Sequence, residues 1–321
     1  MTFEQLKTIQ KDAYRLLQNS YYLDKFAHAY LFEGFTGCGK DEMAIYMAMQ
    51  LLCTGTSKPC LECNNCKKVL HGNHLNVMII KPQTEIIKKE QIDELIHEFS
   101  MSSIEGGNQV YIIYEAEKMN ASASNALLKF LEEPAPNRYG FLVTSNKERI
   151  LPTIISRTQV IYFKPISKKE TVDMLKVNGI DEDIAYCGTT LTQNIEEIQQ
   201  LISEGKIIDF VNVAKNIALS TLKKEDPFVV YYLNKTLFQE ENKKWHRFFF
   251  DVLALIYQEA LKVKNSSEPK YFKSILKNIE KIDININKKL ELIIDQQRRL
   301  NYYVSMPLFY TNFFCELGKD N

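Results

Sequence analysis

The chain has 321 residues, of which 45% are hydrophobic and 25% are charged, and its 40 basic residues balance its 40 acidic ones. A length beyond one ordinary core favours two or three domains, and the composition is that of a folded globular protein. The zero net charge argues against a chain that wraps nucleic acid by itself and favours protein partners.

Five short apolar runs in the first half predict strands that are buried on both faces of a parallel sheet. They cover residues 29–32, 77–80, 110–114, 141–144 and 160–163. Helical patterns separate them and cover residues 40–52, 89–100 and 120–131. The last helix starts at Asn120, a residue suited to capping, and stops before Pro134. Strands that alternate with helices predict a doubly wound α/β domain over residues 1–165.

The strand pattern ends at Pro165, and helical patterns follow it. Residues 166–206 predict a small helical domain, whose first helix could open at 167–169. Residues 207–321 predict a helical C-terminal domain, with its clearest amphipathic segments at 245–262 and 288–300. The sequence therefore predicts three domains, of which the first contains the sheet.

A glycine loop follows the first predicted strand and opens the helix at Lys40. Gly34, Gly37 and Gly39 precede this lysine in the order G-x-x-x-x-G-K. In such a phosphate-binding loop the glycines let backbone amides curl around phosphates, and the lysine reaches the terminal phosphates. The alternative is a chance glycine turn between a strand and a helix, which the preceding strand, the spacing and the lysine make less favoured.

Both residues that would hold magnesium are replaced. Position 41 calls for a Ser or Thr hydroxyl and holds Asp41, whose charge would repel phosphates. The apolar strand at 110–113 should end in an acidic pair, but its first acid is Tyr114 and only Glu115 remains. Glu115 is better read as a leftover or structural carboxylate than as a general base. Without the two metal ligands, ATP hydrolysis by this chain is not expected.

Four of the seven cysteines lie within fourteen residues, at Cys53, Cys60, Cys63 and Cys66. The spacing C-x6-C-x2-C-x2-C can close tetrahedrally around one zinc ion. Four thiolates leave no position for water, so the predicted zinc site, in a module at 53–66, is structural. The alternatives are four free thiols, or three cysteines completed by a histidine (His71 or His74).

The other cysteines and the compartment follow from the same pattern. Clustered thiols indicate a reducing compartment, and neither a secretion signal nor an apolar membrane span is visible, so a cytoplasmic protein is expected. A zinc deaminase is rejected because no histidine is followed two places on by glutamate. The lone Cys38, Cys187 and Cys315 are interpreted as buried small apolar residues.

Arg157 follows the fourth predicted strand, in the segment LPTIISRT at 151–158. Because this chain lacks a working nucleotide site, the arginine could serve a neighbour's nucleotide as a finger supplied in trans. From the residues alone, a surface arginine in a salt bridge is the favoured alternative.

These motifs together resemble a known family. HAYLF at 28–32, the glycine loop, the four cysteines and VYII at 110–113 are followed by NALLKFLEEP at 125–134 and LPTIISR at 151–157. This order resembles the clamp-loader branch of the AAA+ proteins, specifically the delta-prime subunits of DNA polymerase III, with tau/gamma as close relatives. The resemblance covers about half of the chain strongly and continues weakly at 285–292.

The resemblance implies an AAA+ domain with a zinc module, a helical lid and a C-terminal collar domain, in a complex with tau/gamma and delta subunits. Ser156 and Arg157 match the family's Ser-Arg-Cys motif, whose arginine contacts ATP in an adjacent tau/gamma subunit, although Thr158 replaces the cysteine. The implied function is a non-hydrolysing scaffold that helps to load the sliding clamp on primer–template DNA.

Three other functions are weighed against this one. An active tau/gamma-type ATPase would need both magnesium ligands. A P-loop nucleotide kinase would need a metal site and an acceptor motif, which the helical C-terminal part does not show. A zinc-dependent nucleic-acid binder is disfavoured by the zero net charge.

Overall fold

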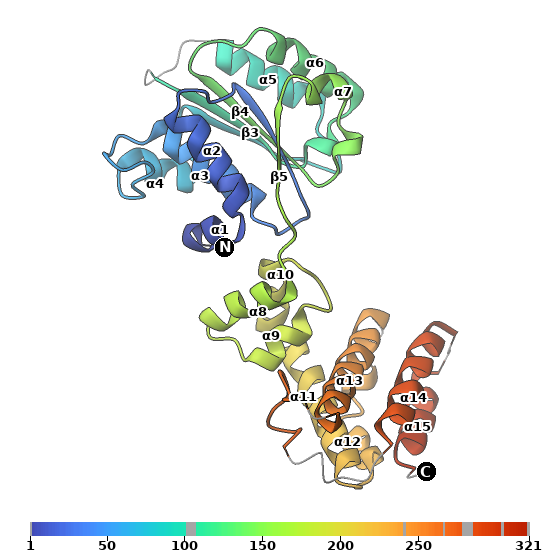
Figure 1. The fold of residues 1–321 in the computed structure, drawn as a ribbon. Coiled ribbons are helices and arrows are strands. Elements are labelled where there is room, and N and C mark those ends of the chain that lie inside the picture. Colours follow the sequence, from blue (N-terminus) through green and yellow to red (C-terminus); the bar gives the residue numbers. More distant parts are fainter. Residues whose placement is uncertain are drawn as a thin grey trace. The chain divides into compact units, whose positions relative to one another are not determined.

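The five apolar runs form one parallel sheet in the computed structural model (Figure 1). The strand order is β2-β3-β4-β1-β5. The strands are β1 (Ala29–Glu33), β2 (Val77–Ile80), β3 (Gln109–Ile113), β4 (Arg138–Thr144) and β5 (Gln159–Tyr162). Because all strands are parallel, their carboxyl ends meet at one edge of the sheet, where open α/β folds place their ligands. The predicted parallel sheet is confirmed.

The structure describes residues 2–100, 107–239, 242–265, 267–277, 285–302 and 305–319. The chain divides into two units, Met1–Ile166 and Ser167–Asn321. This boundary lies one residue from the predicted end of the first domain. The further division of the second unit at residue 206 stays a prediction.

Helices cover both faces of the sheet in the first unit (Figure 1). They are α1 (Phe3–Ile9), α2 (Lys11–Tyr22), α3 (Lys40–Leu52), α4 (Asn64–Leu70), α5 (Lys89–Ser100), α6 (Ala121–Glu132) and α7 (Pro152–Ile155). Short 3-10 turns at Ala116–Lys118 and Lys147–Arg149 follow β3 and β4. The predicted boundaries of α3 and α5 agree with the structure, and Asn120 caps α6 by accepting a hydrogen bond from the Ala123 amide.

Two hydrophobic cores lie on the two faces of the sheet, because successive side chains of a strand point to opposite sides. In β1, Tyr30 and Phe32 belong to the core under α1–α4, whereas Ala29 and Leu31 belong to the core under α5–α7. The helices of each face are thus fixed to the same strands. The loop after β1 and the turn after α7 are held by this shared scaffold.

Gly140 is required by a close approach inside the sheet. It pairs with Tyr111 of the neighbouring strand β3, and a Cβ atom at this glycine would lie 2.0 Å from Cζ of the buried tyrosine ring. We expect Gly140→Ala to lower the free energy of unfolding by about 3 kcal/mol through overpacking, measured by chemical denaturation. In a Tyr111→Leu background the same change should cost less, because leucine lacks the outer ring atoms. Equal costs in both backgrounds would contradict this explanation.

The second unit is built of helices. They are α8 (Lys168–Val177), α9 (Glu182–Gly188), α10 (Ile195–Ser203), α11 (Lys206–Leu222), α12 (Pro227–Leu233), α13 (Lys243–Lys264), α14 (Ile286–Arg299) and α15 (Met306–Leu317), with 3-10 turns at Leu237–Gln239 and Leu300–Tyr302. Ser167 opens α8 with a capping box, as predicted. Aromatic rings from Phe238, Phe249, Tyr310 and Phe314 fill the core between α13 and α15.

The helices predicted at 245–262 and 288–300 and two of the three predicted buried cysteines are found in the structure. The predicted helices at 245–262 and 288–300 correspond to α13 and α14. Cys38 and Cys187 are buried, as predicted, but the prediction for Cys315 is wrong, because this thiol is exposed. On α15 the buried face carries Phe313, Phe314 and Leu317, and Cys315 lies off it.

None of the helices within the described ranges is long and apolar enough to cross a membrane.

Candidate functional site

The phosphate-binding loop joins the carboxyl end of β1 to the start of α3, as the sequence predicts. Gly37 and Gly39 have positive φ angles of 80° and 93°, which glycine adopts without strain. A Cβ atom at Gly34 would lie 2.8 Å from the Cys38 sulfur. Lys40 is buried, and its Nζ donates a hydrogen bond to the Phe35 carbonyl at 3.2 Å. The lysine ammonium is therefore turned towards the backbone of its own loop.

Asp41, at the first of the two positions that lack a magnesium ligand, acts electrostatically on Tyr114, at the second. Burial, followed by the negative charges of Asp41 and Glu42, raises the pKa of Tyr114 above its ordinary value. The Lys81 ammonium lies 5.0 Å from the centre of the Tyr114 ring. A phenol that stays neutral is a poor ligand for magnesium, which prefers carboxylates, phosphates and water.

Glu115, the remaining acid after β3, is engaged locally. Its carboxylate forms an ion pair with Lys118, three residues further on, and its backbone is left-handed with a φ of 51°. The side chain is 51% exposed. These contacts fit the interpretation of Glu115 as a structural carboxylate.

Gln10 fastens the phosphate-binding loop, and sequence reasoning missed it. Its side-chain Nε2 donates hydrogen bonds to the carbonyls of Cys38, at 2.8 Å, and Lys164, at 2.7 Å. Its Oε1 accepts from the Lys164 amide at 3.0 Å. The buried side-chain amide of Gln10 therefore links the loop to the chain just after β5. A second contact joins the loop to the chain after β4, where the hydroxyl oxygens of Thr36 and Ser145 are 3.4 Å apart. No local pattern marks a glutamine whose partners lie 28 and 154 residues away.

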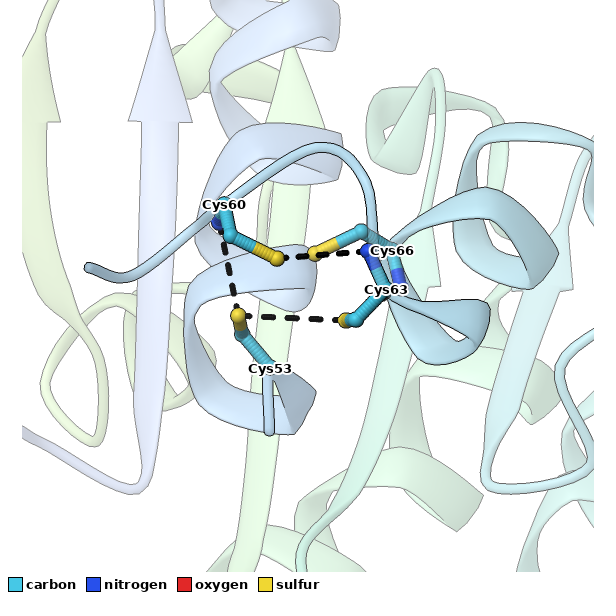
Figure 2. A group of neighbouring side chains, drawn as sticks. All are labelled: Cys53, Cys60, Cys63 and Cys66. Carbon is cyan, nitrogen blue, oxygen red and sulfur yellow. Dashed lines mark hydrogen bonds between the residues drawn. The ribbon is translucent and has the colours of Figure 1, made fainter. Parts of the chain in front are cut away.

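The four clustered cysteines converge, as Figure 2 shows. Their sulfur atoms all lie within 4.8 Å of one another. Those of Cys53 and Cys63 are 3.9 Å apart, close to the roughly 3.8 Å that tetrahedral Zn–S bonds of about 2.3 Å require. Cys53 directly follows α3 as its C-terminal cap, Cys60 lies in the following loop, Cys63 caps α4 and Cys66 lies in its first turn. The group could hold a metal ion, and its donor set suits zinc.

Backbone amides favour the thiolate form of Cys60 and Cys63, whereas burial raises the pKa of Cys66. The amides of Gly55 and Cys60 both donate to the Cys53 sulfur at 3.3 Å, and the Cys63 amide donates to the Cys60 sulfur at 3.3 Å. Hydrogen bonds from the Cys63 and Glu62 amides lower the pKa of Cys60. Burial opposes ionisation of Cys63, but amide bonds, first that of Cys66, outweigh it and lower the pKa of Cys63 to about 5. Thiolates are the form that binds zinc.

The two histidines considered as alternative ligands are bonded elsewhere. The Nδ1 atom of His71 lies 2.7 Å from the Lys67 carbonyl, and Nδ1 of the buried His74 accepts from the Asn76 amide at 3.1 Å. Within the described ranges, the group of side chains that could hold a metal contains the four cysteines and neither histidine. The geometry therefore favours the four-cysteine set.

Arg157 lies just after α7 and is partly exposed. Its Nη2 forms an ion pair with Glu132, the last residue of α6, at 2.8 Å. Its Nη1 donates to the Thr153 carbonyl at 3.0 Å and lies 3.5 Å from the Ser156 hydroxyl. Thr158 donates its hydroxyl to the Ile154 and Ile155 carbonyls, so it belongs to the turn and not to the guanidinium's contacts. The salt bridge that the sequence left as an alternative thus exists within the chain.

Comparisons with known proteins place the chain in a family. Residues 9–167 match the family model described as DNA polymerase III, delta subunit. The chain is 31% identical to the DNA polymerase III subunit delta' of Bacillus subtilis over 95% of both proteins. It is 28% identical to the DNA polymerase III subunit gamma of Buchnera aphidicola over 94% of this chain and 84% of that protein. It is 37% identical to the subunit delta' of Pseudomonas aeruginosa over 41% of each. The chain belongs to the delta-prime family of DNA polymerase III subunits, of which the tau and gamma subunits are relatives.

Proposed function

We propose that the chain is a non-hydrolysing clamp-loader subunit that supplies Arg157 in trans to ATP held by a neighbouring tau/gamma subunit. It holds tau/gamma and delta subunits in a cytoplasmic complex and helps to load the sliding clamp on primer–template DNA. The observation that carries the proposal is the loss of both magnesium ligands: Asp41 stands in place of the hydroxyl residue after the phosphate-binding loop, and Tyr114 stands in place of the acid after β3. Membership in the delta-prime family supports the same role.

The organisation we propose has three domains: an AAA+ domain at 1–165, a helical lid at 166–206 and a collar domain at 207–321. A structural zinc ion bound by Cys53, Cys60, Cys63 and Cys66 stabilises the first of them. Bound there, zinc would supply folding energy and no reaction chemistry, because four thiolates leave no open position. The chain's own residues hold the ion at the end of α3 and the start of α4.

The mechanism in this chain is electrostatic. In phosphoryl transfer, charge develops on the oxygens of the transferred group, and a guanidinium placed beside them lowers the barrier. Arg157 has the planar fork for this contact and lies on a short turn at the surface. Its side chain is 35% exposed, so a partner's phosphates could reach it.

The purified chain is expected to show no magnesium-dependent ATP turnover above the buffer background. The measurement is a steady-state ATPase assay beside the tau/gamma subunit of the same organism, with Lys40→Ala as the control. This lysine is essential to a working phosphate loop. Turnover that Lys40→Ala abolishes would contradict the proposal and favour a tau/gamma-type ATPase. Residual turnover that survives Lys40→Ala would come from a contaminant.

A further inference from the structure

We propose that Glu132 is the positioning residue of Arg157, holding the guanidinium at the surface in the orientation in which it meets a neighbour's phosphates. This inference rests on the proposed function of Arg157. It starts from the 2.8 Å ion pair between the Glu132 carboxylate and Nη2, together with the 3.0 Å bond from Nη1 to the Thr153 carbonyl. Two nitrogens of the fork are thereby fixed from two directions.

Both members of the pair stand on the same rigid support. Glu132 follows the buried Leu127 and Leu131 on α6, and Arg157 follows the buried Ile154 on α7. All three apolar side chains belong to one hydrophobic core under the sheet. The backbone at Arg157 is also tied down, because its amide donates to the Ile154 carbonyl at 3.0 Å. The distance between the carboxylate and the arginine's backbone is therefore set by core packing.

The position of Glu132 at the end of α6 indicates that its ion pair with Arg157 serves more than folding. A carboxylate at the last residue of a helix meets the partial negative charge of the unpaired carbonyls, which disfavours it. The guanidinium of Arg157 offsets that repulsion. The pair itself adds little to folding, because its side chains are 49% and 35% exposed and solvent screens them. Stabilisation of the fold is therefore a weak explanation for the ion pair, and orientation of the Arg157 guanidinium is a stronger one.

Orientation matters because arginine is long and flexible. A guanidinium has five N–H donors, and the intramolecular contacts leave donors for a ligand. Fixing the fork before the neighbour docks removes part of the rotamer entropy that the contact with phosphate would otherwise cost. Catalytic groups that are held in place in this way act more efficiently than free ones.

The test uses the complete reconstituted clamp loader with Glu132→Gln, which keeps an oxygen acceptor but removes the charge. We expect kcat for ATP to fall roughly three- to tenfold, less than the hundredfold that a displacement of about 1 Å can cost. KM for ATP, assembly on a sizing column and the unfolding temperature should not change. The matched control is Glu133→Gln, an equal change of charge at the next residue, which should leave kcat unchanged.

A double-mutant cycle separates positioning from other roles. If Glu132 acts through Arg157, Glu132→Gln should have no further effect in an Arg157→Ala background. A further fall in kcat there, a raised KM or a wild-type kcat in the single Glu132→Gln assembly would overturn the inference. If Arg157→Ala itself leaves kcat unchanged, the proposed function fails, and the inference with it. If Arg157→Ala lowers kcat and Glu132→Gln does not, only the inference fails.

Discussion

Replacing Arg157 with alanine should lower ATP turnover on the order of 10³-fold at the nucleotide site that faces this chain in the assembled clamp loader. A finger supplied in trans contributes at least this much to phosphoryl transfer in other systems. The physical reason is the loss of a fixed positive charge beside oxygens whose negative charge grows in the transition state. The measurement is single-turnover hydrolysis by the reconstituted complex with clamp and primed DNA.

Two further variants make this result specific to the guanidinium. Arg157→Lys keeps the charge but loses the planar fork, so it should recover only a small part of the activity. Arg149→Ala removes an arginine from the 3-10 turn that precedes α7 and should leave turnover unchanged. Each variant must first be shown to enter the complex. Normal hydrolysis by a fully assembled Arg157→Ala complex would refute the role in trans.

Removing the proposed zinc ion from the four-cysteine site should destabilise the first unit by an amount on the order of several kcal/mol. Binding energy at a structural zinc site is folding energy, and the apo form leaves thiols in the core without their ligand. Cys53 and Cys66 are 3% and 1% exposed and belong to the same core as Met47 and Phe32. Loss of the ion should therefore loosen the end of α3 and the start of α4 together.

Metal content and thermal unfolding measure this effect. We expect about one zinc ion per chain by elemental analysis, a lower unfolding temperature with a strong chelator, and loss of zinc in Cys63→Ser. Cys315→Ser replaces an exposed cysteine outside the cluster and should retain the full zinc content. A chain purified with zinc present that contains none, and whose unfolding ignores the chelator, would contradict the assignment.

Element positions were largely predictable, because burial on both faces of a sheet leaves a strong local pattern. The runs at 77–80 and 40–52 match β2 and α3 at both ends. β4 was predicted too short: it begins at Arg138, three residues before the apolar run at 141. Arg138 joins the strand because it pairs with Gln109 of β3. Hydrogen bonding between strands extends an element beyond its apolar residues, and sequence pattern does not record it.

The sequence by itself determined which side chains stand at the two candidate sites, because side-chain identity decides which ligands are available. The sequence alone shows that Asp41 stands in place of a hydroxyl residue and that Tyr114 stands in place of an acid. It also shows the spacing of the four cysteines. Only the tertiary structure decided which residues contact the phosphate loop and Arg157. Gln10 donates a hydrogen bond to the Cys38 carbonyl of the loop, 28 residues further on, and Glu132 pairs with Arg157, 25 residues further on. Such contacts arise when separate segments pack on a common core, and no local periodicity encodes them.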